Sequence, residues 1–477
     1  MHTKTITFAE RMVPGSFKER LRPLLEKADE IIAGDGDNAT SQRMALMVFI
    51  IRVASAAIAF FSQVLLARWM GTFEYGIFVA VWAGTVIAST LIGLGLPSAI
   101  VRFVAEYNEQ KQPGLVWGMI YGSMWFSFAV ATLLSAIAAA CLYFFPNSIS
   151  HYFVMPIYLG ILCLPAFSIE GVNDATARPF NWWKVGFLPT FIFRPLSILA
   201  LMGAAILLGY EPTAETAMWS ALIATYGTSV FQFAALMSKL RKSVIQEPPQ
   251  YRFRYWLAVA LPIFLVESFY VLVTQVDVLF VSWLTNPEET AVYFAATKIL
   301  ALVHFVYFAV RASVSHRFAA YNSSGRIDEY RAFVQKTVTW TFWPSLAIGL
   351  VMVVLGKYLL MMFGEEFVSG QAALSILMLG IVMRASVGPA EALLVMSGKQ
   401  NACAIVYGGA LFVNIVLNVT LIPIYGMLGA AIATALALGF ESIALHSLVK
   451  RKLGIHAFIV PAKQSPNSSA TAGHDPS

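Results

Sequence analysis

Long apolar runs alternate with short polar connections along most of the chain. Each run holds about 20 or more residues, enough for a helix to cross the roughly 30 Å hydrocarbon core of a bilayer. The runs are continuously apolar and do not alternate within segments of about ten residues, which favours helices over a transmembrane β-barrel. The pattern predicts an all-α integral membrane protein with about twelve transmembrane helices, at residues 44–69, 75–99, 115–143, 152–171, 186–208, 214–238, 255–284, 291–310, 337–356, 372–396, 402–423 and 427–449.

Basic residues are distributed unevenly among the polar connections. If the N-terminus lies in the cytoplasm, 26 of the 32 lysines and arginines fall in inside segments, and two, Arg68 and Lys357, fall in outside loops. Lysine and arginine bias the connections that carry them toward the cytoplasm. The distribution therefore supports twelve spans with both termini cytoplasmic. The other four basic residues lie inside apolar runs.

Composition narrows the class of protein further. Of the 477 residues, 58% are hydrophobic and 12% are charged, whereas soluble proteins carry about 25% charged residues. The net charge of +6 lies in the connections assigned to the cytoplasm, which indicates contact with the anionic headgroups of the lipid bilayer and not with nucleic acid. Three cysteines, Cys141, Cys163 and Cys403, lie in apolar runs without metal-ligand spacing, so we expect no metal or cofactor.

The connections also suggest a division of the chain. Residues 240–254 separate six runs from six, which predicts a first six-helix bundle at 44–239 and a second at 255–449. Residues 1–43 precede the first run and carry apolar positions at helical spacing with basic residues between them. We expect a cytoplasmic arm with an amphipathic helix on the membrane surface. Residues 450–477 are expected to form a cytoplasmic tail that is partly disordered.

Three stretches of sequence carry a family resemblance. They are Leu66–Gly76, followed by Gly93–Pro97 and Arg102–Tyr107; Asp277 with Tyr293 and Lys298; and Asn414 through Thr434. Their order and spacing resemble the polysaccharide transporter branch of the superfamily of multidrug, oligosaccharidyl-lipid and polysaccharide exporters, over about residues 44–450.

The resemblance implies two six-helix bundles around a central cavity and a function as a flippase, not an enzyme. Such proteins move undecaprenyl-pyrophosphate-linked oligosaccharide repeat units across the bacterial inner membrane by alternating access. The lipid-linked oligosaccharide would then be used for lipopolysaccharide O-antigen, capsule or exopolysaccharide. A polysaccharide polymerase and chain-length machinery are the implied protein partners.

Two other functions remain as alternatives. An ion-coupled, multidrug-type antiporter for small molecules would need an acidic cavity in the first half, but the deep charges there are arginines. A polysaccharide polymerase or ligase would need a sizeable outer loop, and the longest, at about 357–371, is short. The chain carries no P-loop motif, so we expect no direct use of ATP.

Arginines inside the first half are the first candidates for substrate binding. Arg52 and Arg194 each lie seven to eight residues from the cytoplasmic end of their run, with no acidic residue at membrane depth in the same half. A planar guanidinium matches the oxygens of a pyrophosphate, so both residues, together with Arg384, are candidate substrate-binding residues of a cavity. The alternative is that the side chains extend toward the inner headgroups.

Two residues of the second half are expected to pair across one hairpin. Asp277 and Lys298 each lie seven residues from the outer end of their runs. Equal depth favours an ion pair, either as a structural contact or as a gate or ion-coupling pair.

Another set of charges surrounds a predicted helix break. Arg384 and Glu391 are seven residues apart and share one face of a helix, and Gly388-Pro389 between them is expected to break it. The pair either lines a cavity or neutralises itself internally. Glu267 and Glu391 complete the candidates for gating or ion coupling. Glu267 is also a candidate partner for Arg52 in an ion pair between the two bundles.

Overall fold

The computed structural model describes residues 37–145, 149–324 and 326–460. Contacts divide the chain into two units, Met1–Phe61 and Ser62–Ser477. The described part of the first unit is helical. Most of the predicted amphipathic arm, and the tail beyond residue 460, lie outside the described residues.

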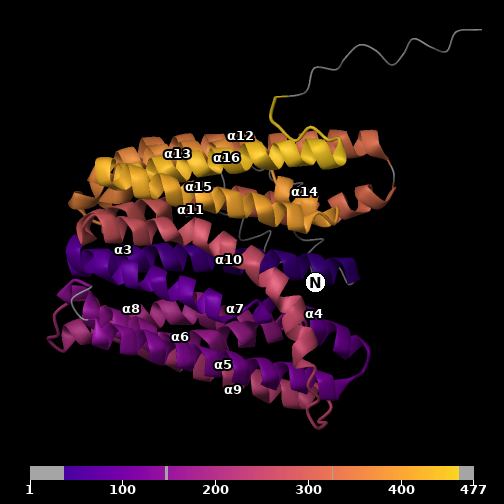
Figure 1. Cartoon of the computed structure of the whole chain (residues 1–477), viewed down its shortest axis with the longest axis horizontal. Coiled ribbons are helices and arrows are strands. Elements are labelled where there is room, and N and C mark those ends of the chain that lie inside the picture. The colour runs from indigo at the N-terminus through magenta and orange to yellow at the C-terminus, as the bar shows by residue number, and fades with distance from the viewer. Residues whose placement is uncertain (1–36, 146–148, 325, 461–477) are drawn as a thin grey trace, which may run out of the picture. The chain divides into compact units, whose positions relative to one another are not determined.

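The first half of the chain is helical, with the elements labelled in Figure 1. They are α3 (Asp37–Ile92), α4 (Leu96–Glu109), α5 (Pro113–Phe144), α6 (His151–Ala177), α7 (Trp183–Leu188), the π-helix η2 (Pro189–Phe193), α8 (Arg194–Leu207) and α9 (Ala214–Ser243). The second half continues with α10 (Phe253–Leu284), α11 (Pro287–Ser324), α12 (Ile327–Met361), the 3-10 helix η3 (Glu365–Gly370), α13 (Gln371–Ala385), α14 (Ala390–Met396), α15 (Gln400–Tyr425) and α16 (Met427–Leu453).

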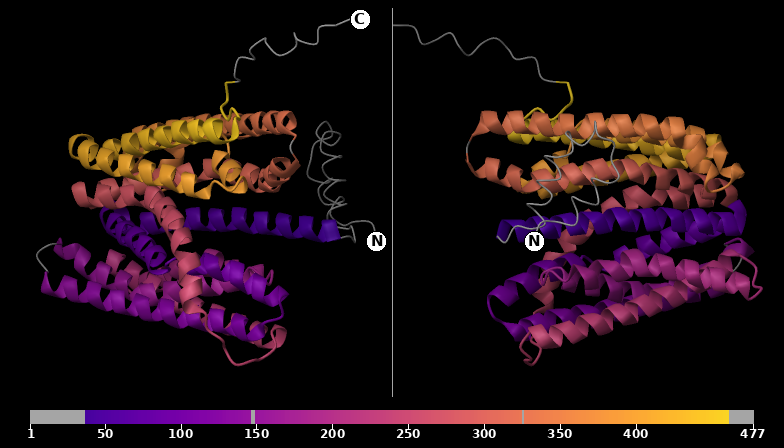
Figure 2. Two further views of the ribbon diagram at one scale, coloured as in Figure 1. Left: turned by 45° about the vertical axis from the view of Figure 1, so that its right-hand side comes forward. Right: turned by 180° about the vertical axis from the view of Figure 1, so that it is seen from behind.

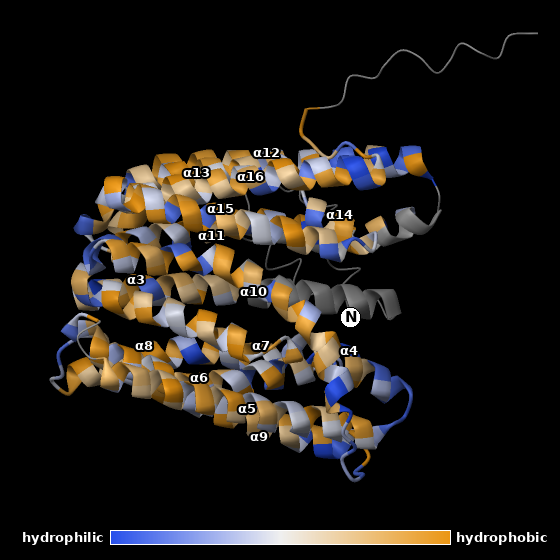
Figure 3. Ribbon diagram, in the orientation of Figure 1, coloured by the Kyte–Doolittle hydropathy of each residue, from blue (hydrophilic) through white to orange (hydrophobic). Residues whose placement is uncertain are grey.

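The predicted all-α membrane fold is confirmed. Within the described residues, ten helices are long and apolar enough to cross a membrane, or eleven when the bent α10 counts as one span. The difference from twelve runs lies in α3, where Gly71 has non-helical angles (φ 74°, ψ 175°) and separates the first two predicted runs. Figure 3 shows apolar residues along the helices and hydrophilic ones mostly at their ends and connections.

The second predicted run ends earlier than expected because of a close backbone approach. α3 stops at Ile92, and Gly95 (φ 70°) turns the chain into α4. A Cβ atom at Gly95 would lie 2.3 Å from the carbonyl oxygen of Ala260 in α10. Only glycine allows this contact, so the predicted run 75–99 is divided between two helices.

Helix α10 contacts both halves of the chain. Its first turns contribute Trp256 and Ala260 to the apolar core that α4, α5, α6 and α9 form. A 45° bend between Phe269 and Val271 changes its direction, and it also packs against α11 and α15. Figures 1 and 2 show α10 running obliquely between the helices of the two halves.

A second apolar core lies among α11, α12, α14, α15 and α16. The chain after α16 belongs to it, because Ile455 and Ala457 are buried there. The first residues of the predicted tail are therefore packed. Cys163 and Cys403 are buried, whereas Cys141 is exposed on the surface of α5, a position that the apolar character of a thiol permits beside lipid.

Candidate functional site

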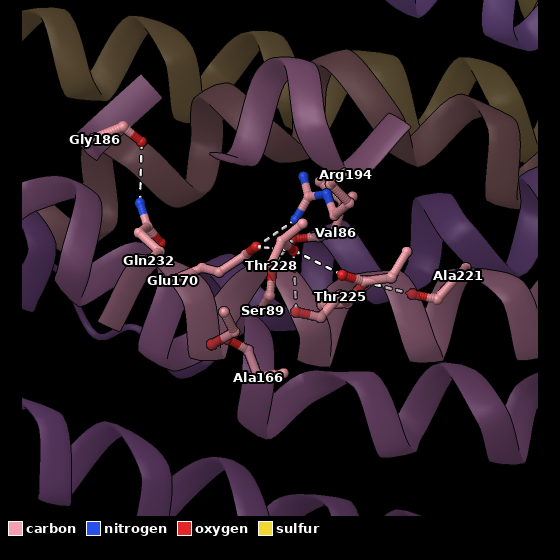
Figure 4. Close-up of polar contacts among 12 residues, drawn as sticks. Val86, Ser89, Ala166, Glu170, Gly186, Arg194, Ala221, Thr225, Thr228 and Gln232 are labelled. Atoms are coloured by element: carbon pink, nitrogen blue, oxygen red, sulfur yellow. Dashed lines mark hydrogen bonds and ion pairs between the residues drawn. The ribbon is translucent and has the colours of Figure 1, made fainter. Parts of the chain in front are cut away.

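Arg194 lies at the first turn of α8, directly after the π-helix η2. Its Nη1 atom is 2.5 Å from Oε2 of Glu170 on α6. The other carboxylate oxygen of Glu170 lies 3.0 Å from the Thr228 hydroxyl on α9, which can donate to it or to the carbonyl oxygen of Ala224 at 2.8 Å. The guanidinium also lies against two aromatic rings, 4.6 Å from the centroid of Phe167 and 5.7 Å from that of Trp82. Figure 4 shows Arg194, Glu170 and Thr228 pointing toward one another.

The expectation that Arg194 has no acidic partner in its own half is therefore wrong. The apolar run 152–171 placed Glu170 at the edge of a span, but α6 continues to Ala177. The polar residues after Glu170 face the interior of the bundle, where Asn173 is fully buried. A hydropathy pattern cannot separate polar residues that end a span from polar residues that face other helices.

The guanidinium of Arg194 is only partly engaged. An arginine side chain carries five N–H donors, and in the described part of the chain only Nη1 of Arg194 has a hydrogen-bond partner. Nε and Nη2 have no described partner, but they are not fully buried and keep some solvent-accessible surface. The side chain as a whole is 14% exposed and that of Glu170 is 3% exposed. Arg194 can therefore accept a further anion without losing an existing hydrogen bond from Nε or Nη2.

Buried polar groups without partners continue from this pair toward the end of α6. Among the described residues, neither amide atom of Asn173 has a hydrogen-bond partner. Gln232 on α9 donates to the carbonyl oxygens of Val185 and Gly186 at 3.1 and 3.0 Å, and its Oε1 has no partner in the same part of the chain. Figure 4 shows the Gln232–Gly186 contact beside the Glu170 pair. Such groups require water or a polar ligand.

Arg384 has the opposite character, because all three of its nitrogens are engaged. Nε donates to Glu441 at 2.6 Å, Nη1 to the carbonyl oxygen of Gly388 at 3.2 Å, and Nη2 to the Tyr307 hydroxyl at 3.3 Å and to Glu391 at 3.5 Å. This arrangement favours internal neutralisation of the charges over substrate binding.

Glu391 completes this cluster. Its Oε1 lies 2.7 Å from Nη1 of Arg311, and the Tyr407 hydroxyl donates to its Oε2. Two arginines thus face two glutamates. Of these, Arg384, Glu391 and Glu441 line a small cavity of about 70 Å³. The predicted break is confirmed, because α13 ends at Ala385 and α14 begins at Ala390.

The expected ion pair between Asp277 and Lys298 is absent. The Asp277 carboxylate accepts hydrogen bonds from the Tyr293 hydroxyl at 2.5 Å and the Thr434 hydroxyl at 3.0 Å. The Lys298 ammonium lies 4.2 Å from the centroid of Phe294. Tyr293 takes the position beside Asp277 that was expected for Lys298.

The remaining two candidates are not brought together by any described contact. Glu267 is half-buried on α10 and accepts a hydrogen bond from the hydroxyl of Ser98 in α4. The backbone of Arg52 is part of α3, and its side chain lies outside the described residues. Pairing of Arg52 with Glu267 stays a prediction.

The loops predicted to lie outside the membrane are in close contact. Arg68 donates to the carbonyl oxygens of Met362 and Met361 at 2.5 and 3.1 Å. The Thr72 hydroxyl donates to Glu366 at 2.8 Å. These contacts join the part of α3 around Gly71 to the end of α12 and to η3.

Backbone packing also brings α3 close to α11. A Cβ atom at Gly76 would lie 1.8 Å from the carbonyl oxygen of Pro287, and the ring of Tyr75 packs edge-on against Phe294 and Phe367. Residues of α3, α6 and α10, with Ile149 and Ser150 of the connection before α6, line a cavity of about 400 Å³.

Sequence comparison identifies the family. The profile described as "Polysaccharide biosynthesis protein" matches residues 43–315, and the profile named MatE matches residues 262–420. No curated protein sequence matches the chain.

Solved structures share the fold. An inward-facing multidrug resistance MATE family transporter of the MOP superfamily is 14% identical, with a TM-score of 0.70 over 85% of this chain and 98% of that one. The lipid II flippase MurJ, in an inward closed conformation, is 16% identical, with a TM-score of 0.65 over 85% and 87%. A MOP superfamily transporter from Pyrococcus furiosus is 13% identical, with a TM-score of 0.63 over 89% and 97%. This multi-pass membrane protein has the fold of the MOP superfamily transporters, and because the first profile spans more than half of the chain, it belongs to the polysaccharide biosynthesis protein family.

Proposed function

We propose that the protein is a flippase that moves undecaprenyl-pyrophosphate-linked oligosaccharide repeat units from the inner to the outer leaflet of the bacterial inner membrane. The family supports a role in polysaccharide synthesis, and one structural neighbour is a flippase of lipid II. The observation that carries the proposal is Arg194, a guanidinium at membrane depth with open Nε and Nη2 donors. A pyrophosphate offers the paired oxygens that such a fork binds.

The path of the substrate follows from the closed outer contacts. The headgroup enters from the cytoplasmic side, while the polyprenyl chain stays in the lipid. Its pyrophosphate binds Arg194, with Arg52 as the second candidate ligand. The closed outer ends then separate and release the headgroup to the other side, as alternating access requires.

The second-half charges take a supporting role in this proposal. Arg384 is fully engaged by Glu441, Glu391, Tyr307 and Gly388, so we assign it to holding the broken span and not to the substrate. Asp277, whose carboxylate is bound by uncharged hydroxyls, is the best placed candidate for ion coupling.

The surroundings of the protein follow from the same proposal. Both termini lie in the cytoplasm, and the flipped units are passed to a polysaccharide polymerase and its chain-length machinery for lipopolysaccharide, capsule or exopolysaccharide. The chain itself acts as a transporter and carries out no covalent chemistry.

A multidrug-type antiporter is the second candidate function. The MatE match supports it, and so does the buried carboxylate of Glu170 in the first half. Because Arg194 neutralises that carboxylate at 2.5 Å, the site carries no net negative charge to attract an organic cation. The Nε and Nη2 donors of Arg194 that make no described hydrogen bond favour an anionic substrate.

A reconstitution experiment tests the proposal. Vesicles that contain the purified protein and a fluorescent undecaprenyl-pyrophosphate oligosaccharide are expected to exchange the lipid between leaflets faster than empty vesicles. Exchange at the rate of empty vesicles would contradict the flippase function.

A double variant separates binding from structure. Arg194→Gln alone leaves Glu170 buried without its cation, so a loss of exchange has two explanations. Arg194→Gln with Glu170→Gln replaces the ion pair by an uncharged pair of similar shape. We expect this double variant to fold and to remain inactive, because the phosphate ligand is missing. Restored exchange would show that the pair is only structural.

A further inference from the structure

We propose that Glu170 is a built-in competitor for the anion site of Arg194. Its carboxylate occupies Nη1 of the guanidinium when no substrate is bound. A phosphate that arrives at the open Nε and Nη2 donors competes with Glu170 for the same cation and displaces it. This inference rests on the proposed function, because it takes the pyrophosphate of a polyprenyl lipid as the incoming anion.

The contact between Glu170 and Arg194 uses one oxygen and one nitrogen. Oε2 of Glu170 is 2.5 Å from Nη1, whereas Oε1 accepts the Thr228 hydroxyl at 3.0 Å. An arginine and a carboxylate bind most strongly as a fork with two parallel hydrogen bonds. With Oε1 bound to the Thr228 hydroxyl, the pair makes one described hydrogen bond instead of the fork. The pair is therefore weaker than the geometry of its two groups allows.

The displaced carboxylate has a second place to bind. Asn173 lies one helical turn along α6 and is fully buried, and neither of its amide atoms has a partner within the part of the chain that the structure describes. Residues three apart on a helix are neighbours on one face. The Asn173 amide and the Thr228 hydroxyl can thus donate to Glu170 when a phosphate takes Arg194. Two donors reduce the cost of leaving a buried carboxylate without its cation.

A competitor of this kind suits a transporter. A site that holds an anion by a free, buried arginine binds tightly and releases slowly, and transport needs binding that is weak enough to allow release. When the phosphate leaves, the Glu170 carboxylate returns to Arg194 and neutralises the positive charge of the guanidinium. The chain supplies the replacement anion itself, so release does not leave an unpaired charge in the membrane.

The affinity for a soluble isoprenyl pyrophosphate tests the inference. Farnesyl pyrophosphate is titrated into the purified, detergent-solubilised full chain by calorimetry, with farnesol as the uncharged control. Glu170→Gln keeps the shape of the side chain and removes its charge. We expect its Kd to fall about tenfold, which corresponds to about 1.4 kcal/mol. In the vesicle assay, both the half-saturating lipid concentration and the maximal rate are expected to fall.

Thr228→Val gives a change of opposite sign. Valine matches threonine in shape but cannot donate to Oε1 of Glu170, so the carboxylate is free to form the fork on Arg194. We expect weaker binding of farnesyl pyrophosphate than in the wild type. A purely structural ion pair predicts no such opposition between the Glu170 and Thr228 variants.

The second half offers a matched control in Glu441→Gln. Glu441 is also bound to a buried arginine, at 2.6 Å, but Arg384 keeps Glu391 when Glu441 is neutralised. We expect the affinity for farnesyl pyrophosphate to stay unchanged. If Glu170→Gln fails to fold, Glu170→Asp, which withdraws the carboxylate by one methylene, is expected to tighten binding in the same direction.

Two negative outcomes are distinguishable. Equal or weaker binding in Glu170→Gln, with binding lost in Arg194→Gln, would overturn the competitor and leave Arg194 as the phosphate ligand. Unchanged binding in both variants would overturn Arg194 as the ligand and the competitor with it.

Discussion

The backbone N–H of Ile459 donates a hydrogen bond to the carbonyl oxygen of Ser386 at 2.9 Å. Ser386 lies in the break between α13 and α14, where the helix leaves backbone groups without partners. The chain after α16 therefore caps the broken span. Gln335 holds the same segment, because its Nε2 donates to the carbonyl oxygen of Phe458 at 3.0 Å.

This contact predicts different results for two truncations. Removal of residues 461–477 leaves the cap in place and is expected not to change the thermal unfolding temperature in detergent. Removal of residues 455–477 exposes Ser386 and deletes the buried Ile455 and Ala457. Loss of one buried isoleucine alone costs about 1.5–3 kcal/mol, so we expect a clearly lower unfolding temperature.

Thiol labelling locates the effect of the longer truncation. Cys403 is buried in the same apolar core as Ile455, whereas Cys163 is buried in α6. The longer truncation is expected to speed maleimide labelling of Cys403 and to leave Cys163 unchanged. Equal labelling of Cys403 in both truncations would contradict the cap.

Gly76→Ala is predicted to open the outer contacts. The new Cβ would lie 1.8 Å from the carbonyl oxygen of Pro287, so one of the two backbones must move. In a cysteine-free background, cysteines at Thr72 and Glu366, whose side chains touch, report the closure by oxidative cross-linking. We expect less cross-linking in Gly76→Ala. Gly84→Ala is the control on the same helix, since its Cβ would meet Leu279 at an ordinary 3.7 Å.

Neutralising Arg384 is predicted to destabilise the second half. Arg384→Gln leaves Glu441 buried without its cation, and breaking a buried pair in this way costs about 3–5 kcal/mol. Arg384→Gln with Glu441→Gln removes both charges and is expected to recover part of the loss, because Glu391 keeps Arg311 at 2.7 Å. Thermal unfolding in detergent measures both. A double variant no more stable than the single one would argue against the pairing.

Two glutamates near the predicted outer connections, Glu74 in α3 and Glu289 in α11, are predicted to have parallel effects. Glu74 accepts a hydrogen bond from the first backbone N–H of α9 at 2.7 Å, and Glu289 accepts one from the first N–H of α16 at 2.7 Å. A carboxylate at a helix N-terminus contributes about 0.3–1 kcal/mol. Glu74→Gln and Glu289→Gln are each expected to lower stability by about this amount, measured by thermal unfolding. Glu288, which neighbours Glu289 and has no such described contact, gives the control Glu288→Gln.

The sequence predicted the fold class well because span length and charge bias depend on composition along the chain. It predicted the break at Gly388-Pro389 for the same kind of reason, since proline acts on its own backbone. The break at Gly71 likewise falls in the predicted connection 70–74 between the first two runs.

The side-chain pairings were less predictable. Asp277 and Lys298 were matched by depth, but each residue along a helix turns the side chain by about 100°, and depth alone leaves that angle open. Glu170 was placed at a span edge because polar residues follow it. Its partner Thr228 is 58 residues away, and no local pattern indicates such a contact.

The Arg68 contact has a consequence for how this sequence can vary. Its acceptors are the carbonyl oxygens of Met361 and Met362, at the end of α12, where helix carbonyls have no partner within the helix. The side chains at these two positions do not take part in the contact. The hydrogen bonds from Arg68 therefore tolerate substitution at these two positions. One residue inserted within α12 would instead rotate and shift its last carbonyl groups away from Arg68. The closed state thus constrains the length of α12 more strictly than the identity of the residues at its end.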